Sequence, residues 1–379
     1  MLKKLNLAFF RLGLIFNKIY CLNKIIGGIY TMSLIESICK NIYPLDSRFM
    51  EQAKARQDRL IKPEGSLGKL EDISIQLAGI YGSKYFDTTK KIVLSFACDH
   101  GVYEEGVAPH PQNITILQSK NFPHKINGVG TISKFVGADV QLIDVGINSD
   151  EKLEGVIDCK IRKSTSNMAK GPAMTRQEAI RSIEIGIETC EKYIQDDYKL
   201  IGIGEMGIAN TTPSTAIISV ISGCDPEEIT GIGAGLKTEL LAHKAQVIRT
   251  AIEINQPNPT DGIDILQKVG GFEIGAMAGV ILGCSANRVP VVLDGYISYA
   301  AALIACNINP RCKEYMIASH LSAEPGAKKA LDLLGLDPFL NMDMRLGEGS
   351  GAALAFNMIE AANFVYKNML TFDEVDMGM

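Results

Sequence analysis

The chain of 379 residues contains no tryptophan, and none of its nine cysteines forms a Cys-x-x-Cys pair. A zinc site built from paired cysteines is therefore not indicated, and cysteines scattered through apolar runs are typical of small core residues in a reduced protein. No cluster of histidine and carboxylate residues occurs at the spacing of metal ligands. The formal net charge is −5, without a basic stripe after the first few dozen residues, which disfavours nucleic-acid binding. We expect neither a metal nor a cofactor.

Nucleotide-binding signatures are missing or misplaced. No Walker A sequence occurs anywhere in the chain. Residues Gly202 to Gly207 spell Gly-x-Gly-x-x-Gly, but the first glycine lies inside an apolar run and the next helix is expected only from Pro213. A dinucleotide site needs these glycines to open the helix directly, so an NAD-dependent oxidoreductase is disfavoured.

Residues 1–31 differ from the rest because they carry five basic residues and no acidic one. Their apolar runs are too short and too interrupted to span a bilayer, and they lack the clean apolar stretch of a signal peptide. We favour a start codon assigned too early, so that residues 1–31 are not translated and Met32 is the first residue. A basic amphipathic surface helix is the alternative. No membrane contact is expected for 32–379.

The remaining sequence, with 36 glycines and 46% hydrophobic residues, is typical of an α/β enzyme with a sizeable core. Residues 34–81 follow a helical pattern, broken by Pro63 and Gly65, after which Ser66 is a candidate N-cap. From there, near-continuous apolar strands alternate with helices, which predicts a parallel sheet covered on both faces. Expected strands span 92–97, 140–143, 200–203, 291–293 and 315–318, and expected helices span 175–194, 213–222, 235–254, 272–282, 298–306 and 326–334.

Polar residues recur where these strands end. They are Asp99, Asp144, Glu205, Asp294 and the pair Ser319/His320. A single such residue usually caps a turn, but ligands of open parallel sheets bind at the carboxyl edge of the strands. We therefore expect all of them to converge on one rim.

Glu348 stands between Gly347 and Gly349, just before an apolar run at 352–358 that reads as a helix with Ser350 as N-cap. Glycine on both sides lets a ligand approach the backbone, so the carboxylate is expected on a turn at a helix entrance. The alternative is a carboxylate that only complements the helix dipole. Glu205 occurs in a similar setting, which favours the functional interpretation of both.

Two further stretches suggest ligand contacts. The glycine-rich turn 231–235 is followed by a helix with Lys244, and Thr212-Pro213 predicts a helix start that offers an anion site. The alternative is a set of tight turns with a solvated lysine. The proline-rich loop 106–111, with a helix expected to open at 112–118, is a candidate wall for a planar ligand or an ordinary connection.

Several longer motifs are more specific, and they occur in a fixed order over about residues 33–370. They are Asp99-His100-Gly101-Val102, Gly204 to Thr212, Asn255 to Pro259 with Asp261 to Asp264, Val269 to Phe272, Ser319 to Glu324, and Arg345 to Gly351. As a set they resemble the nicotinate-nucleotide:dimethylbenzimidazole phosphoribosyltransferase family. The resemblance implies a homodimeric enzyme with a Rossmann-like α/β domain, here 88–349, and a smaller helical domain built from 33–82 and 350–370. The scattered cysteines favour a cytoplasmic location.

The resemblance also implies a reaction, in which nicotinate mononucleotide and 5,6-dimethylbenzimidazole give α-ribazole 5′-phosphate and nicotinate for the lower ligand of cobalamin. Glu348 falls on the base that removes the benzimidazole proton, and Glu205 on a second carboxylate near the ribose. One carboxylate within hydrogen-bond reach is enough for that proton transfer. The implied phosphate and ribose contacts are Gly207, Gly233, Lys244 and Ser322, and the implied walls of the base pocket are His110 and Gln118.

Position 110 departs from the family, where this contact can be a small serine. The departure bears on the choice of acceptor base, so the same chemistry with adenine, a methoxybenzimidazole or a phenol is the nearest alternative. A non-catalytic nucleotide-binding protein on the same fold is a second one. The intact turns around Glu348 and Glu205 disfavour it, because a binding module needs no base there.

Overall fold

A computed structural model describes residues 32–376 of the chain. The chain divides into a short unit, 1–37, and a large unit, 38–379, which holds the sheet and the site. The expectations for residues 1–31 lie outside the described residues. Within 32–376, no helix combines the length and the apolar character that crossing a membrane requires.

The large unit is built on a six-stranded sheet in the order β3-β2-β1-β4-β5-β6, in which every neighbouring pair is parallel. The central strand β1 (Lys91–Cys98) is buried along its whole length, as the apolar run predicts. Its neighbours are β2 (Asp139–Gly146) and β4 (Leu200–Met206), followed outward by β5 (Val291–Leu293) and β6 (Met316–Ala318). The predicted parallel α/β fold is thus confirmed. The edge strand β3 (Ile157–Asp158) was not predicted, because two residues carry no periodic pattern.

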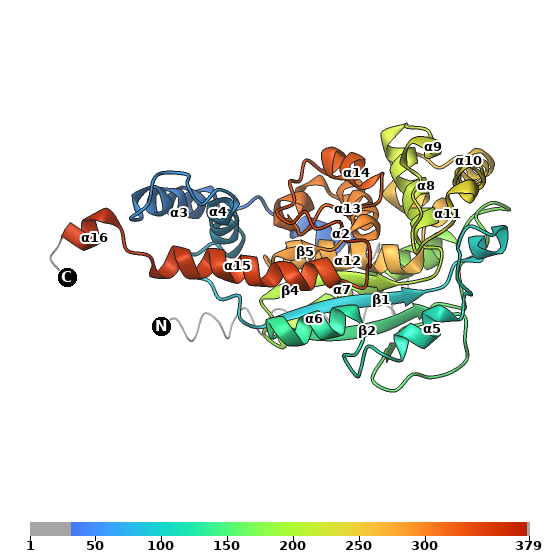
Figure 1. Ribbon diagram of the computed structural model, residues 1–379, viewed down its shortest axis with the longest axis horizontal. Coiled ribbons are helices and arrows are strands. Elements are labelled where there is room, and N and C mark those ends of the chain that lie inside the picture. Colours follow the sequence, from blue (N-terminus) through green and yellow to red (C-terminus); the bar gives the residue numbers. More distant parts are fainter. Residues whose placement is uncertain (1–31, 377–379) are drawn as a thin grey trace. The chain divides into compact units, whose positions relative to one another are not determined.

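Helices cover both faces of the sheet (Figure 1). On one face α12 (Phe272–Ala286) packs against α7 (Arg176–Gln195) so closely that a Cβ at Gly186 would lie 1.8 Å from the Ala276 carbonyl oxygen. On the other face α15 (Ser350–Asn368) lies on β4 and β1, beside α6 (Gly128–Val136). The remaining helices are α2 (Leu34–Lys40), α3 (Ser47–Arg59), α4 (Lys69–Tyr81), α5 (Ile114–Ser119), α8 (Thr211–Ser222), α9 (Pro226–Ile229), α10 (Leu241–Asn255), α11 (Gly262–Val269), α13 (Tyr296–Ile308), α14 (Ala327–Leu334) and α16 (Phe372–Asp376), with 3-10 turns at Gly101–Glu105, Thr238–Leu240 and Pro310–Tyr315.

The helix boundaries correct several expectations. The helix expected from residue 235 begins at Leu241, because Gly235 adopts a φ of 110° that ends the preceding turn. Ser350 is not an N-cap but the first helical residue, preceded by Gly349 with a φ of 98°. Ser66 and Thr212 are not N-caps either, since Gly68 precedes α4 and Asn210 precedes α8. Serine and threonine signal a helix start only approximately, and glycine displaces them where the chain needs a positive φ.

Helices α3 and α4 pack together, and α4 also packs against the C-terminal part of α15. The ring of Phe86 stacks on Tyr81 and Tyr366, and Arg56 donates hydrogen bonds to the carbonyl oxygens of Tyr366 and Met369. One hydrophobic cluster connects α4, α15 and the sheet. The division into a helical domain, 33–82 with 350–370, and a domain 88–349 stays a prediction.

Candidate active site

A cavity of about 320 Å³ opens at the carboxyl ends of β4, β5 and β6. Its walls come from the turn before α15, the ends of these strands, α5 and the glycine-rich loop at Gly233. Seven of the eight residues expected from the sequence line it: Glu348, Glu205, Gly207, Gly233, Ser322, His110 and Gln118. The eighth, Lys244, lies directly behind Gly233, where a Cβ would stand 3.6 Å from its Nζ.

The turn around Glu348 directs a buried carboxylate into this cavity. Glu348 has a φ of 66°, and its glycine neighbours have φ values of 85° and 98°. Its Oε2 accepts hydrogen bonds from the Val129 N–H at 2.9 Å and the Asn127 Nδ2 at 3.0 Å, both at the start of α6. Its Oε1 accepts none from the described residues. Burial raises the pKa of Glu348 above its ordinary value, although these hydrogen bonds oppose the rise.

Glu205 is the second carboxylate of the cavity, and it follows Gly204 at the end of β4. Its Oε2 accepts a hydrogen bond from Asn210 Nδ2, and its Oε1 lies 3.4 Å from the Glu348 backbone nitrogen. Burial raises its pKa to about 8, and the neighbouring charge of Asp294 adds to the rise. Near neutral pH, Glu205 therefore carries a proton.

Asp294 is a third buried carboxylate that lines the cavity. It follows β5, is 3% exposed, and accepts hydrogen bonds from the N–H groups of Gly349 at 3.1 Å and Gly351 at 2.7 Å. His320, which follows β6, places its Nε2 3.8 Å from Asp294 Oδ1. The sequence placed Asp294 and His320 on the rim of the sheet, with His320 as a candidate acid–base group and no role for Asp294.

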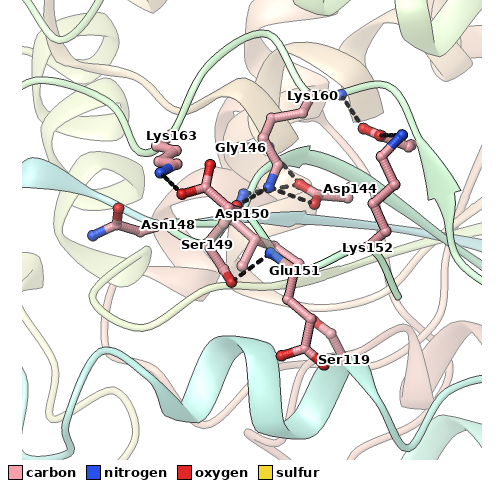
Figure 2. Close-up of polar contacts among 12 residues, drawn as sticks. Ser119, Asp144, Gly146, Asn148, Ser149, Asp150, Glu151, Lys152, Lys160 and Lys163 are labelled. Carbon is pink, nitrogen blue, oxygen red and sulfur yellow. Dashed lines mark hydrogen bonds and ion pairs between the residues drawn. The ribbon is translucent and has the colours of Figure 1, made fainter. Parts of the chain in front are cut away.

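Three of the strand-end residues that were expected to converge do not line this cavity: Asp144, Asp99 and Ser319. Asp144 turns its carboxylate back onto its own strand end, where it accepts from the Gly146 N–H at 3.0 Å and pairs with Lys160 at 3.1 Å (Figure 2). Asp99 accepts from the Asn148 N–H at 2.8 Å. Neither residue lines the cavity, because local backbone donors hold both carboxylates beside the β1–β2 side of the sheet.

The glycine-rich loop around Gly233 forms another part of the cavity wall. Lys244 is 1% exposed, so the alternative of a solvated lysine was wrong. Its Nζ donates to Thr211 Oγ1 at 2.8 Å and to the Gly231 carbonyl at 3.0 Å. Burial lowers its pKa to about 8, while the charge of Glu324 opposes the fall.

Three residues around this loop were missed by the sequence reasoning. Glu324 accepts the Gly233 N–H at 3.0 Å, Arg345 Nη1 donates to the Gly233 carbonyl at 3.2 Å, and Thr211 holds Lys244. All three lie within the motifs that carry the family resemblance. The signal was therefore present, but only the fold shows that the three motifs meet at one loop.

His110 and Gln118 lie on the side of the cavity nearest α5. His110 Nε2 is 3.2 Å from the Ala234 carbonyl oxygen, so the proline-rich loop and the glycine-rich loop touch at the mouth of the cavity. Ile114, Met206 and Leu346 add apolar surface between them. The wall therefore combines polar groups with apolar side chains, as a planar aromatic ring requires.

Outside the cavity, the fold assembles a group that sequence spacing did not reveal. Cys98, His100 and Glu273 place one ligand atom each within 4.8 Å of one another, and all three side chains are buried. His100 Nε2 lies 3.0 Å from Glu273 Oε1. Glu273 comes from α12, far along the chain from the other two, so no local motif connects them.

Comparison with known proteins gives a consistent result. A family model described as phosphoribosyltransferase matches residues 42–377. A nicotinate-nucleotide–dimethylbenzimidazole phosphoribosyltransferase of Clostridioides difficile (strain 630) is 75% identical over 347 residues, which cover 92% of this chain and 100% of that protein. The protein of the same name from Escherichia coli (strain K12) is 49% identical over 339 residues, covering 89% of this chain and 94% of its own length.

Solved structures agree with the sequence comparisons. The crystal structure of CobT from Thermus thermophilus matches with a TM-score of 0.83 and 35% identity, covering 87% of this chain and 98% of that one. The sequence motifs, the parallel sheet with its cavity at the strand ends, and these similarities lead to one assignment. The chain is a phosphoribosyltransferase and belongs to the nicotinate-nucleotide–dimethylbenzimidazole phosphoribosyltransferase family.

Proposed function

We propose that this enzyme transfers the phosphoribosyl group of nicotinate mononucleotide to 5,6-dimethylbenzimidazole, giving α-ribazole 5′-phosphate and nicotinate for the lower ligand of cobalamin. The observation that carries the proposal is the arrangement of Glu348. One carboxylate oxygen is fixed by Asn127 and Val129, and the other accepts no hydrogen bond from the described residues. A base held in this way has a defined direction and a lone pair left for the acceptor.

In the proposed reaction, a ring nitrogen of the acceptor attacks C1′ of the ribose and the bond from C1′ to the nicotinate nitrogen breaks. The electron pair of that bond stays on the nicotinate ring, which was cationic in the nucleotide and leaves neutral. The second ring nitrogen of the acceptor becomes acidic as the new bond forms, and Glu348 takes its proton. A pKa raised by burial makes Glu348 a better base, and such a base contributes about 10²–10⁴-fold in rate.

Glu205 takes a different role in this proposal. Because burial and Asp294 raise its pKa to about 8, it enters the reaction protonated and donates a hydrogen bond near the ribose. Two carboxylates whose environments differ divide their tasks in this way. Glu348 keeps hydrogen-bond donors that favour its charged form, while Glu205 lies beside further buried carboxylates.

The phosphate is assigned to the end of the cavity formed by Gly207, Gly233 and Ser322, with Lys244 behind the loop. The start of α8 supports this assignment, because Thr211 lines the cavity and the positive end of the helix dipole favours an anion there. The buried Lys244 supplies a positive charge at short range, in surroundings of low dielectric constant.

The aromatic acceptor is assigned to the wall formed by His110 and Gln118. We also propose that the enzyme is a cytoplasmic homodimer in which 33–82 and 350–370 form a small helical domain. Exposed apolar side chains on and next to two helices that pack together, α6 and α15, support the dimer. Phe135 is 78% exposed, Phe364 67% and Ile126 65%.

The decisive experiment is chromatographic. Purified protein is incubated with nicotinate mononucleotide and, in separate reactions, with 5,6-dimethylbenzimidazole, adenine, a methoxybenzimidazole or a phenol. We expect release of nicotinate and a new ribotide that depend on 5,6-dimethylbenzimidazole. Release with another acceptor alone would contradict the proposed substrate, and no release from folded protein with any acceptor would contradict the proposed reaction.

A further inference from the structure

The turn that carries Glu348 has an unfavourable backbone. Gly347, Glu348 and Gly349 all have positive φ values, of 85°, 66° and 98°. Glycine adopts this region freely, whereas a residue with a Cβ does so only when its surroundings hold it there. The position of the Glu348 carboxylate therefore depends on what fixes this turn from behind.

Asp294 contacts this turn at the point where the turn leads into α15. The N–H groups of Gly349 and Gly351 lie at the helix entrance, where an α-helix offers no acceptor of its own. Asp294 Oδ2 accepts from Gly349 at 3.1 Å, and Oδ1 accepts from Gly351 at 2.7 Å. A Cβ at Gly351 would lie 2.9 Å from Asp294 Oδ1, so the glycine allows this close approach.

Asp294 is itself held rigidly. It follows β5 in the interior of the sheet, and its carbonyl oxygen accepts hydrogen bonds from Ser319 Oγ at 3.0 Å and from the Tyr299 hydroxyl at 3.2 Å. The turn is also held on its other side, where Ser95 Oγ donates to the Glu348 carbonyl at 2.7 Å. Two parts of the sheet thus hold the turn: Ser95 in β1 and Asp294 directly after β5.

The charge of Asp294 also reaches both glutamates of the cavity. Repulsion from it adds to the burial that raises the pKa of Glu205 and of Glu348. Around Asp294 itself, burial raises the pKa, while His320 and the N–H donors of α15 oppose the rise. The titratable groups that face it are therefore His320 after β6, Glu205 at the end of β4, Glu348, and the hydroxyl of Tyr299 on α13.

We propose that Asp294 is a positioning residue for Glu348, whose carboxylate clamps the entrance of α15 and thereby aims the base at the acceptor nitrogen. The inference rests on the proposed function for its consequence in catalysis, but the clamp itself is a property of the fold. Asp294 lines the cavity, and in this account it acts through the backbone of the turn rather than on a reacting atom.

The test compares Asp294→Asn with wild-type enzyme. Asparagine has the same shape, but its Nδ2 meets one of the two N–H donors, so half of the clamp is lost. We expect kcat to fall by about 10²-fold, the loss that a small misplacement of a catalytic group produces, with an unchanged dissociation constant for nicotinate mononucleotide. The pH below which kcat declines should also move down, because removing a neighbouring negative charge lowers the pKa of Glu348.

Asp144→Asn is the matched control. Asp144 is also a buried strand-end aspartate that accepts two backbone N–H groups, from Gly146 at 3.0 Å (Figure 2) and from Ile147 at 2.9 Å. Unlike Asp294, it does not line the cavity. A loss of stability common to strand-end aspartates would appear in both variants. The shift of the kcat profile should appear only in Asp294→Asn. Wild-type kcat and an unmoved profile in Asp294→Asn, or the same changes in both variants, would overturn the proposal.

Hydrogen exchange separates the clamp from the reaction. In wild-type protein without substrate, the amides of Gly349 and Gly351 should exchange slowly, and in Asp294→Asn faster, while Asp144→Asn leaves them slow. Fast exchange in wild-type protein would refute the clamp, and this measurement does not depend on a variant that folds. If wild-type protein released no nicotinate, the proposed reaction would fail, and the exchange rates would still decide whether Asp294 holds the turn.

Discussion

Glu348 Oε2 and the backbone nitrogen of Val129 lie 2.9 Å apart, which ties the turn before α15 to the N-terminus of α6. The two residues stand far apart in the sequence and on separate structural elements. A carboxylate at a helix N-terminus is stabilised in its charged form by the N–H groups and the helix dipole. Glu348 is therefore oriented before any substrate arrives. Burial raises its pKa, and this stabilisation of the charged form opposes the rise.

Replacing Glu348 by glutamine should abolish most turnover. Glutamine keeps the shape of the side chain but cannot take a proton, so we expect kcat to fall by about 10²–10⁴-fold. Binding of both substrates should persist, which calorimetry with nicotinate mononucleotide and 5,6-dimethylbenzimidazole would measure. Wild-type turnover by Glu348→Gln would exclude Glu348 as the base.

Replacing Lys244 by alanine should weaken the binding of nicotinate mononucleotide but not the binding of the acceptor base. The buried ammonium lies behind Gly233, and its loss removes the positive charge at the proposed phosphate position. We expect a higher Michaelis constant for nicotinate mononucleotide and an unchanged dissociation constant for the acceptor base. Lys237→Ala is the matched control, because it removes an exposed lysine near the same loop. An unchanged Michaelis constant for the nucleotide in Lys244→Ala would refute the phosphate role.

The pH dependence of nucleotide binding should also report on Lys244. Its pKa is lowered to about 8 by burial, so the side chain is charged below that pH and loses its charge above it. The dissociation constant of nicotinate mononucleotide should therefore rise between about pH 8 and pH 10. Titration calorimetry at several pH values measures it. In Lys244→Ala this rise should be absent, and an equal rise in both proteins would assign it to another group.

The stability of the free protein should depend on pH through Glu205. Its folded-state pKa of about 8 lies above the ordinary value of 4.5, so the folded state retains a proton that the unfolded state releases in this range. The contribution of Glu205 to the free energy of unfolding is fully present below pH 4.5 and is lost as pH rises through about 8. Its size is on the order of a few kcal/mol.

Glu205→Gln should lose this dependence and gain stability relative to wild type as pH rises from 5 to 9. Urea unfolding at both pH values measures the difference between the two proteins. A difference that stays constant with pH would mean that Glu205 is ionised in the folded protein, which would also remove its proposed role as a hydrogen-bond donor.

Much of the fold follows from local pattern. The strands at 92–97, 140–143, 200–203 and 291–293 were found because fully buried parallel strands are continuous apolar runs. Helix α6 was missed because its residues, Gly128–Val136, mix glycine, serine and lysine. The same helix supplies the donors to Glu348, so the orientation of the base could not be predicted from the sequence.

The sequence by itself determined the glycine-flanked carboxylates, the glycine-rich loops and the order of strands and helices, because each depends on backbone preferences of neighbouring residues. Only the tertiary structure decided that Lys244 is buried, that Asp144 turns away from the cavity, and that Asp294 holds the turn that carries Glu348. Burial and the field of neighbouring charges arise from packing between distant segments. The protonation of Glu205 and the direction of Glu348 therefore belong to the fold rather than to any motif.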